Sequence, residues 1–196
     1  MNKFVTVLYW IWSCTWGSIM TIIGAIIALF LIISGHKPRV FHHNVYFRFG
    51  RGWGGVNFGA FFFLSESQVD STLQHEAGHG LQNLILGPMM PFVVAIPSAF
   101  RCWLREYTYK GMKIAAAITL SVASALGVVL FILGLAHSLT AIWVIGLLVV
   151  LYAAILAIWM FKKEIPQYAN NAYVDYDSIW FEGCATRWGE KCFSLE

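Results

Sequence analysis

Three long runs without a charged side chain limit what this chain can fold into. Residues 4–33, 114–136 and 140–161 contain no Asp, Glu, Lys or Arg, and each is as long as the roughly 20 apolar residues that a helix needs to cross a bilayer. The sequence is 59% hydrophobic and only 12% charged, outside the usual range of soluble domains. We therefore predict a mainly α, multi-pass membrane protein with about three transmembrane helices, forming a single domain over residues 1–196.

Positive residues flank these runs and predict an orientation. Lysines precede and follow the pair of runs at 114–136 and 140–161, which are joined by the polar link His137-Ser138. Because lysine and arginine concentrate in cytoplasmic loops, the pair is expected to form a hairpin with both outer ends cytoplasmic. Only Lys3 precedes the first run, which implies an outside N-terminus. The net charge of +3 then reflects clusters beside the lipid bilayer of a bacterial-type cytoplasmic membrane, and no nucleic-acid partner is expected.

A fourth apolar segment, residues 84–100, is short and interrupted. It contains Gly87, Pro88, Pro91 and Pro97, so it suits a broken span, a re-entrant loop or an interfacial helix. Positive residues lie on both sides of it, which favours a segment that does not fully cross.

Residues 69–86 have the pattern of a helix with one polar face. Serines and Asp70 near its start are candidate N-caps, and Gly87-Pro88 is a typical helix end. The polar face carries histidines, a glutamate and amides, and the opposite face is apolar. A surface amphipathic helix whose histidines bind nothing is the alternative interpretation.

The polar face contains the motif His75-Glu76-Ala77-Gly78-His79, which has the form H-E-x-x-H. Two histidines four residues apart lie one turn above each other, so both imidazoles can reach one metal ion. The adjacent Glu76 can accept a proton from a water molecule on that metal. The motif predicts a zinc site on this helix.

A catalytic zinc site needs a third protein ligand. The candidates near the C-terminus are Asp175, Asp177, Glu182, Cys184, Glu190 and Cys192. Glu182 is preferred within the third-ligand segment 175–196, because residues 179–186 can form a second short helix in which Gly183 and Ala185 permit close approach. This segment reaches the face of the motif helix only if the chain crosses the membrane an even number of times between them.

The H-E-x-x-H motif, followed about a hundred residues later by E-x-x-A, resembles the gluzincin branch of the zinc metallopeptidases. It is loosely similar to membrane-embedded members whose third ligand is a glutamate on a later helix. The resemblance covers the motif helix and the Glu182 segment. It implies that His75, His79 and Glu182 bind Zn²⁺ and that Glu76 is the general base.

The sequence also departs from related patterns. Gluzincins often have an acidic residue four positions after the third ligand, to orient a histidine, whereas this chain has Thr186. Asp175 or Asp177 would have to take that role, or no residue does. Gln82 and Ile85 stand where metzincins have glycine and a third histidine, which excludes that branch, and no Leu-Asp-Gly follows as in the intramembrane site-two type.

Residues 45–64 are expected to form a small β-hairpin, because two β-prone runs flank a glycine-rich stretch at 50–55. Its edge could hold an extended peptide beside the motif helix. An aromatic hairpin at head-group depth is the alternative. Among the tyrosines near Glu182, which are Tyr168, Tyr173 and Tyr176, we prefer Tyr176 as a donor to a developing oxyanion.

The sequence thus predicts a membrane-bound zinc peptidase whose active site faces the cytoplasm and whose substrates are peptides or membrane proteins. The mechanism would use a zinc-activated water with Glu76 as the base. Two alternatives remain: a non-catalytic metal-binding scaffold or sensor, and a transporter subunit in which the motif is accidental.

Overall fold

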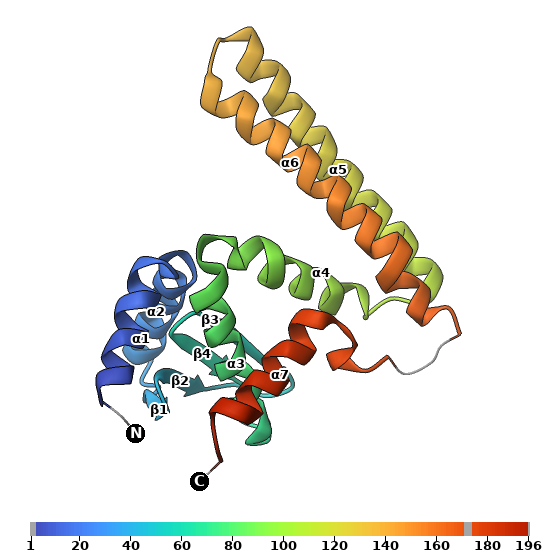
Figure 1. Ribbon diagram of the computed structural model, residues 1–196. Coiled ribbons are helices and arrows are strands. Elements are labelled where there is room, and N and C mark those ends of the chain that lie inside the picture. The colour runs from blue at the N-terminus through green and yellow to red at the C-terminus, as the bar shows by residue number, and fades with distance from the viewer. Residues whose placement is uncertain (1–2, 171–173, 196) are drawn as a thin grey trace. The chain divides into compact units, whose positions relative to one another are not determined.

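The computed structural model describes residues 3–170 and 174–195 (Figure 1). The chain is mainly helical with a small mixed sheet, which confirms the predicted fold class in outline. Among the described residues, two helices are long and apolar enough to cross a membrane, or up to four if each of two sharply bent pairs is one span. The chain divides into two compact units, Met1–Ile96 with Asp175–Glu196, and Pro97–Val174.

The first apolar run forms a bent pair of helices instead of the single helix expected over 4–33. Helices α1 (Lys3–Thr15) and α2 (Ser18–Ile33) meet at an angle of 100°. Gly17 at the break lies against the side chain of Asn83, and a Cβ atom there would overlap that amide. At about 1.5 Å per residue each helix is shorter than the hydrocarbon core, which is about 30 Å thick.

A four-stranded sheet follows, built from β1 (Arg39–Phe41), β2 (Asn44–Arg48), β3 (Gly55–Phe58) and β4 (Phe61–Leu64). The strand order is β1-β2-β4-β3. The pairs β1–β2 and β3–β4 are antiparallel, whereas β2 and β4 are parallel. The expected hairpin between the two halves of 45–64 does not form, because the glycine-rich stretch is a crossover and not a tight turn. As a result β3 is an edge strand.

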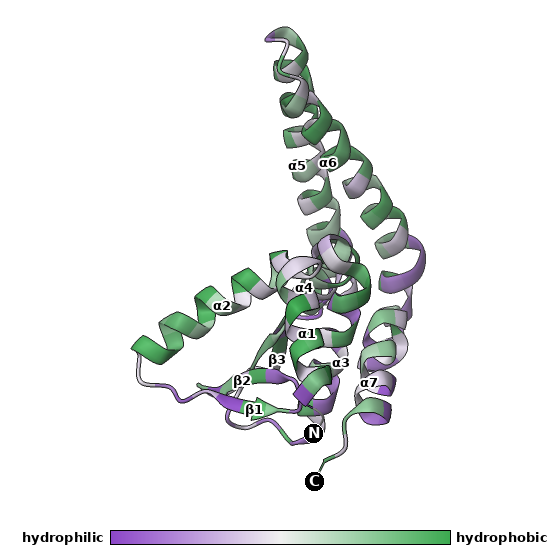
Figure 2. Ribbon diagram, turned by 60° about the vertical axis from the view of Figure 1, so that its left-hand side comes forward, coloured by the Kyte–Doolittle hydropathy of each residue, from purple (hydrophilic) through white to green (hydrophobic). Residues whose placement is uncertain are grey.

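Helices cover both faces of this sheet. Phe63 of β4 packs with Phe47 and with Ala28 of α2, whereas the neighbouring Phe62 faces the other way and clusters with Leu73 of α3 (Ser71–Leu86). Side chains alternate between the two faces of a strand, so one strand contributes to both cores. Figure 2 shows α2 on one side of the sheet, with α3 and α7 (Trp180–Cys192) on the other.

The bounds of α3 agree with the helix predicted over 69–86. It ends at Gly87, whose φ of +51° favours glycine. The chain then forms a 3₁₀ turn (Gly87–Met89) and a π-helical turn (Pro91–Ala95) at a sharp bend. Before α7, the segment Tyr176–Ser178 is a 3₁₀ turn.

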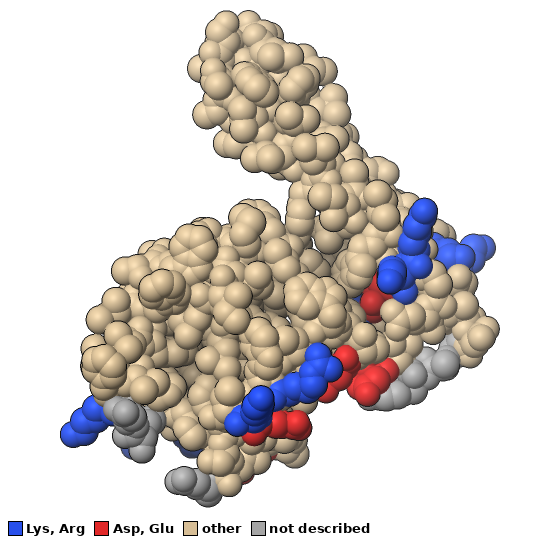
Figure 3. Space-filling model, viewed as in Figure 1, with Lys and Arg blue, Asp and Glu red and all other residues tan. Residues whose placement is uncertain are grey.

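The second unit contains the helical hairpin predicted from the last two apolar runs. This unit comprises α4 (Ile96–Leu104), of which it includes the residues from Pro97 on, and the hairpin helices α5 (Tyr109–Ala136) and α6 (Thr140–Trp159). Helix α6 continues as a π-helical turn (Met160–Glu164) and a 3₁₀ turn (Ile165–Tyr168). Gly134 meets the backbone of Trp143 on the facing helix, where a Cβ atom would not fit. Glycine contacts of this kind allow close packing in lipid. Figure 3 shows the surface of this hairpin without charged side chains over most of its length.

A buried ion pair ties α4 to the end of α6. Nε of Arg101 donates to Oε1 of Glu164 over 2.6 Å, and the two side chains are 1% and 2% exposed. The hydroxyl of Tyr168 also donates to this carboxylate, over 3.2 Å. The pair is flanked by an apolar cluster that includes Leu104 and Met160.

Candidate metal centre

The polar face of α3 is turned into the protein and not toward solvent. Glu76 and His79 are buried, as are the amides Gln82 and Asn83. The part of the alternative interpretation that makes α3 a surface helix is therefore wrong, whereas metal binding by its histidines stays a prediction. A buried polar group is costly unless it is paired, so the hydrogen-bond partners of this face determine how the site is built.

Helix α7 supplies most of those partners, and small residues bring it close to α3. Gly78 lies against the backbone of Ala185, and Gly189 lies against the backbone of Gln74, with no room for a Cβ atom at either glycine. Of the two small residues that the sequence singled out for close approach, Ala185 has this role. Gly183 packs instead against the backbone of Asp177.

The close approach brings together three ligand atoms. Nε2 of His79 lies 3.0 Å from Oε2 of Glu182 and 3.1 Å from Nε2 of His75, and the remaining pair, His75 and Glu182, is 3.3 Å apart. The Glu182 side chain is fully buried. The three residues chosen from the sequence as metal ligands thus form one cluster that could hold a metal ion, and Asp175, Asp177, Cys184, Glu190 and Cys192 are not part of it.

Gln82 orients His79. Its Nε2 donates to the carbonyl of Phe181 over 2.6 Å, which leaves Oε1 as an acceptor 2.8 Å from Nδ1 of His79. The proton of the neutral imidazole is thereby held on Nδ1, and the lone pair of Nε2 points into the cluster. The sequence analysis used Gln82 only to exclude metzincins. Its position three residues after His79, on the same helix face, is the signal that could have revealed this role.

Thr186 and Asp177 orient His75. The Thr186 hydroxyl donates to Oδ1 of Asp177 over 3.0 Å, and its oxygen lies 2.8 Å from Nδ1 of His75. A hydroxyl whose proton is used in this way is an acceptor, so it holds the His75 proton on Nδ1. The sequence left Asp175 and Asp177 open for this role. Asp177 acts through Thr186, and Asp175 instead accepts a hydrogen bond from the backbone N–H of Asp177.

The donor set fits a zinc ion. Two imidazole nitrogens and one carboxylate oxygen are the protein ligands of many catalytic zinc sites, and at about 2.0–2.1 Å from the metal, tetrahedral ligands lie about 3.3 Å from one another. With both Nδ1 atoms protonated, two Nε2 lone pairs face each other across 3.1 Å, an arrangement that a cation stabilises. Burial lowers the pKa of His79, but in the doubly protonated imidazolium Nε2 donates to Glu182, and this hydrogen bond together with the charge of Glu182 outweighs burial and raises the pKa overall.

Glu76 lies beside the cluster with a free carboxylate oxygen. Its Oε2 is buried and has no hydrogen-bond partner among the described residues. Burial raises the pKa of this carboxyl, and the neighbouring His75 and His79 partly offset that effect. An unpartnered buried carboxylate is costly to keep, which is typical of a group held ready for a ligand or a proton.

The edge strand β3 borders Glu76. Gly55 packs against the Glu76 carboxyl, with no room for a Cβ atom, and Nδ2 of Asn57 donates to the Glu76 backbone carbonyl over 2.8 Å. The sequence did not single out Asn57. Its contact fixes the position of an open strand beside the candidate general base.

The tyrosines named from the sequence lie in different places. The Tyr176 ring lies 5.6 Å from the His75 ring, centroid to centroid, so it borders the cluster. Tyr168 is in the second unit with Glu164, and Tyr173 lies outside the described residues.

Comparison with known proteins gave no match. No family model matches the sequence, and no curated protein and no solved structure matches it.

Proposed function

We propose that the protein is a membrane-bound, zinc-dependent peptidase whose ligands are His75, His79 and Glu182 and whose general base is Glu76. The convergence of three ligand atoms from helices far apart in the sequence, at separations of 3.0–3.3 Å, carries this proposal. The free oxygen of Glu76 beside them favours catalysis over a purely structural ion, because a structural site is closed and needs no neighbouring base.

The residues around the cluster have separate roles in the proposed reaction. Zinc, when bound, lowers the pKa of a coordinated water toward neutrality and polarises a substrate carbonyl. Glu76 accepts the proton of the attacking water and then delivers it to the leaving amine. Gln82 and Thr186 hold the two imidazoles in place, and the Tyr176 hydroxyl is our candidate for binding the developing oxyanion.

An extended peptide is the substrate that the site suits. Among residues 3–170 and 174–195, strand β3 pairs with β4 alone, so its outer edge can pair with a peptide backbone. The contacts of Gly55 and Asn57 with Glu76 would place such a peptide next to the base. Membrane proteins or peptides at the bilayer surface are therefore the proposed substrate class.

The packing of α7 on α3 supports the proposed topology. Helices in contact on one side of a bilayer are separated by an even number of crossings. Helices α5 and α6 account for two crossings, so residues 84–100 would enter and leave on the same side. The lysines at the outer ends of the α5–α6 hairpin favour a cytoplasmic active site.

Metal content per chain tests the ligands, and cleavage tests the base. We expect about one zinc per chain in purified protein, retained in Glu190→Ala, which changes an exposed glutamate on α7, and lost in His79→Ala and Glu182→Ala. Glu76→Gln should keep zinc and lose cleavage of a fluorogenic peptide mixture by about 10²–10⁴-fold. Absence of zinc in folded, zinc-supplied protein would refute the proposal, and an active Glu76→Gln variant would remove Glu76 as the base.

A further inference from the structure

The outer face of α2 is apolar along its whole length. Helix α2 buries Met20, Thr21, Gly24 and Ala28 and carries no charged residue, and Figure 2 colours most of it as hydrophobic. Helices on the surface of a soluble protein have a polar outer face. Here the outward residues include Ile19, Ile22, Ile26, Leu29, Phe30 and Ile33, all more than 40% exposed.

Helix α2 lies along the sheet and must share its depth relative to the bilayer. Gly24 lies against the backbone of Phe58 in β3, and one turn later Ala28 packs with Phe47 and Phe63. The sheet has open edges at β1 and β3, and open edges are not tolerated in hydrocarbon. A helix packed flat on such a sheet cannot cross the membrane core.

The start of α1 is bound to residues that follow α2. Oγ1 of Thr6 lies 2.9 Å from Nδ1 of His43, and the buried hydroxyl of Tyr9 donates to Oδ1 of Asn44 over 2.6 Å. The first turns of α1 and the segment that follows α2 therefore lie next to each other. A segment whose two flanks touch has not been carried across a bilayer.

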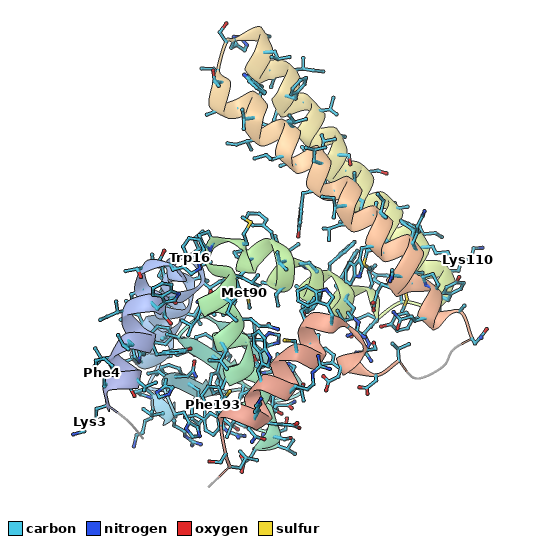
Figure 4. All side chains as sticks on the ribbon, viewed as in Figure 1. Lys3, Phe4, Trp16, Met90, Lys110 and Phe193 are labelled. Carbon is cyan, nitrogen blue, oxygen red and sulfur yellow. The ribbon has the colours of Figure 1, made fainter. Side chains whose placement is uncertain are left out.

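We propose that residues 3–33 form a monotopic anchor, which lies in the head-group region on the same side as the His75, His79 and Glu182 cluster and immerses the outer face of α2 in lipid. The bilayer is the partner because α5 and α6 of the same chain are long and apolar enough to cross one. The exposed Lys3, Lys37 and Arg39 at the two ends of the pair complement anionic lipid head groups. Figure 4 marks Lys3 at one end of α1 and Trp16 at the bend.

Trp12 of α1 and Trp16 at the break between α1 and α2 fit the same placement. The indole N–H of Trp12 donates to the carbonyl of Leu84 over 2.9 Å, and that of Trp16 donates to the carbonyl of Ile85 over 3.3 Å. Both rings are about half exposed. An amphipathic ring with its polar atom paired and its body exposed is typical of the membrane interface. The proposal places the start of α1 on the same side of the membrane as the cluster, whereas Lys3 alone implied an N-terminus on the outside.

The depth of α2 in lipid tests the anchor. Nitroxides are placed one at a time by Ile19→Cys, Ile26→Cys and Ile33→Cys in the full chain after its four cysteines are changed to serine. Their accessibility to oxygen and to a nickel chelate is measured in vesicles that contain phosphatidylglycerol. We expect a uniform depth of about 5–10 Å below the head groups. A spanning helix would change depth by about 1.5 Å per residue, or about 21 Å between the outer two positions, and that result would overturn the proposal.

The transmembrane hairpin gives a matched control. Ile118→Cys, Leu126→Cys and Leu133→Cys are exposed on α5 and should show the gradient that α2 lacks. A gradient on α5 together with uniform depth on α2 supports the anchor without any reference to metal or peptidase activity.

Sidedness provides a second, independent test. Lys3→Cys, Lys37→Cys and Glu190→Cys should react with an impermeant maleimide from one face of the membrane, and Ser138→Cys, in the loop between α5 and α6, from the other. Reaction of Lys3→Cys from the face that labels Ser138→Cys would show that the first helix pair crosses.

Discussion

The hydroxyl oxygen of Thr186 lies 2.8 Å from Nδ1 of His75, at the position where the gluzincin pattern has an acidic residue. The Thr186 hydroxyl in turn donates to Oδ1 of Asp177 over 3.0 Å, so a carboxylate is linked to His75 through this hydroxyl. The Thr186 hydroxyl orients the His75 ring, and the charged Asp177 carboxylate lies one hydrogen bond farther from His75 than a directly bonded acidic residue would.

Removal of this hydroxyl should weaken metal binding. Thr186→Val has nearly the same shape but leaves Nδ1 of His75 without its acceptor, so we expect zinc affinity to fall by about 10–100-fold. Thr186→Ser, which keeps the hydroxyl, should retain most of the affinity. Competition with a chromophoric chelator measures the dissociation constant of each variant. Equal affinity for Thr186→Val and the parent would show that the contact does not orient the ligand.

Gln82 should matter for stability as well as for the metal. Gln82→Met removes the donor to the Phe181 carbonyl and leaves the buried N–H of His79 without its acceptor, and such an unpaired N–H should cost about 1–3 kcal/mol. Thermal unfolding in detergent, with and without added zinc, measures the loss. Gln167→Met is the comparison, because Gln167 is exposed and loses only hydrogen bonds to the Lys163 carbonyl and to Oε2 of Glu164, so it should lose less stability than Gln82→Met.

Contact between α3 and α7 should be sensitive to one methyl group. Gly78→Ala would favour an isolated helix by roughly 1 kcal/mol, but the added Cβ atom meets the carbonyl of Ala185. Overpacking of this kind costs about 1–3 kcal/mol. We therefore expect lower thermal stability and reduced zinc content.

Gly54→Ala serves as the control for Gly78→Ala, because a Cβ atom at Gly54 would meet nothing within 4 Å. If Gly78→Ala matched this control in both stability and zinc content, the close approach of the two helices would not be essential.

The two residues of the buried ion pair in the second unit should stabilise the fold only when both are present. Glu164→Gln leaves the Arg101 guanidinium buried without its counter-charge, and breaking such a pair typically costs about 3–5 kcal/mol. The double variant Arg101→Met with Glu164→Met should be closer to the parent than either single change. Unfolding midpoints measured in detergent compare the parent, the single variants and the double variant.

The exposed pair between Arg51 and Glu66 supplies the comparison, with side chains 84% and 52% exposed. Glu66→Gln should leave the midpoint almost unchanged, because solvent screens such pairs. A loss as large as that of Glu164→Gln would contradict the role that we give to burial.

Features set by local sequence were predictable. The bounds of α3 follow from its polar start and from Gly87, and the α5–α6 hairpin follows from apolar runs of spanning length. Glu182 was preferred over five other candidates because Gly183 and Ala185 on the same short helix permit close approach, and of these two Ala185 makes the contact with α3. In each case the deciding residues lie within a few positions of the feature.

Features set by distant contacts were not predictable. The break between α1 and α2 depends on Gly17 meeting Asn83, which is 66 residues away. The parallel pairing of β2 with β4 depends on a crossover, and the alternation of apolar residues does not distinguish it from a hairpin. Gln82 could not be recognised as a bridge to Phe181 without the position of α7.

The candidate metal centre also sets an order of events during synthesis. Glu182 follows His79 by 103 residues, and the α5–α6 hairpin lies between these two candidate ligands. The nascent chain therefore carries the two histidines without this carboxylate while the hairpin is synthesised. The ligand set is complete only after α7 has emerged from the ribosome and docked on α3, so a partly translated chain cannot hold the three-ligand centre.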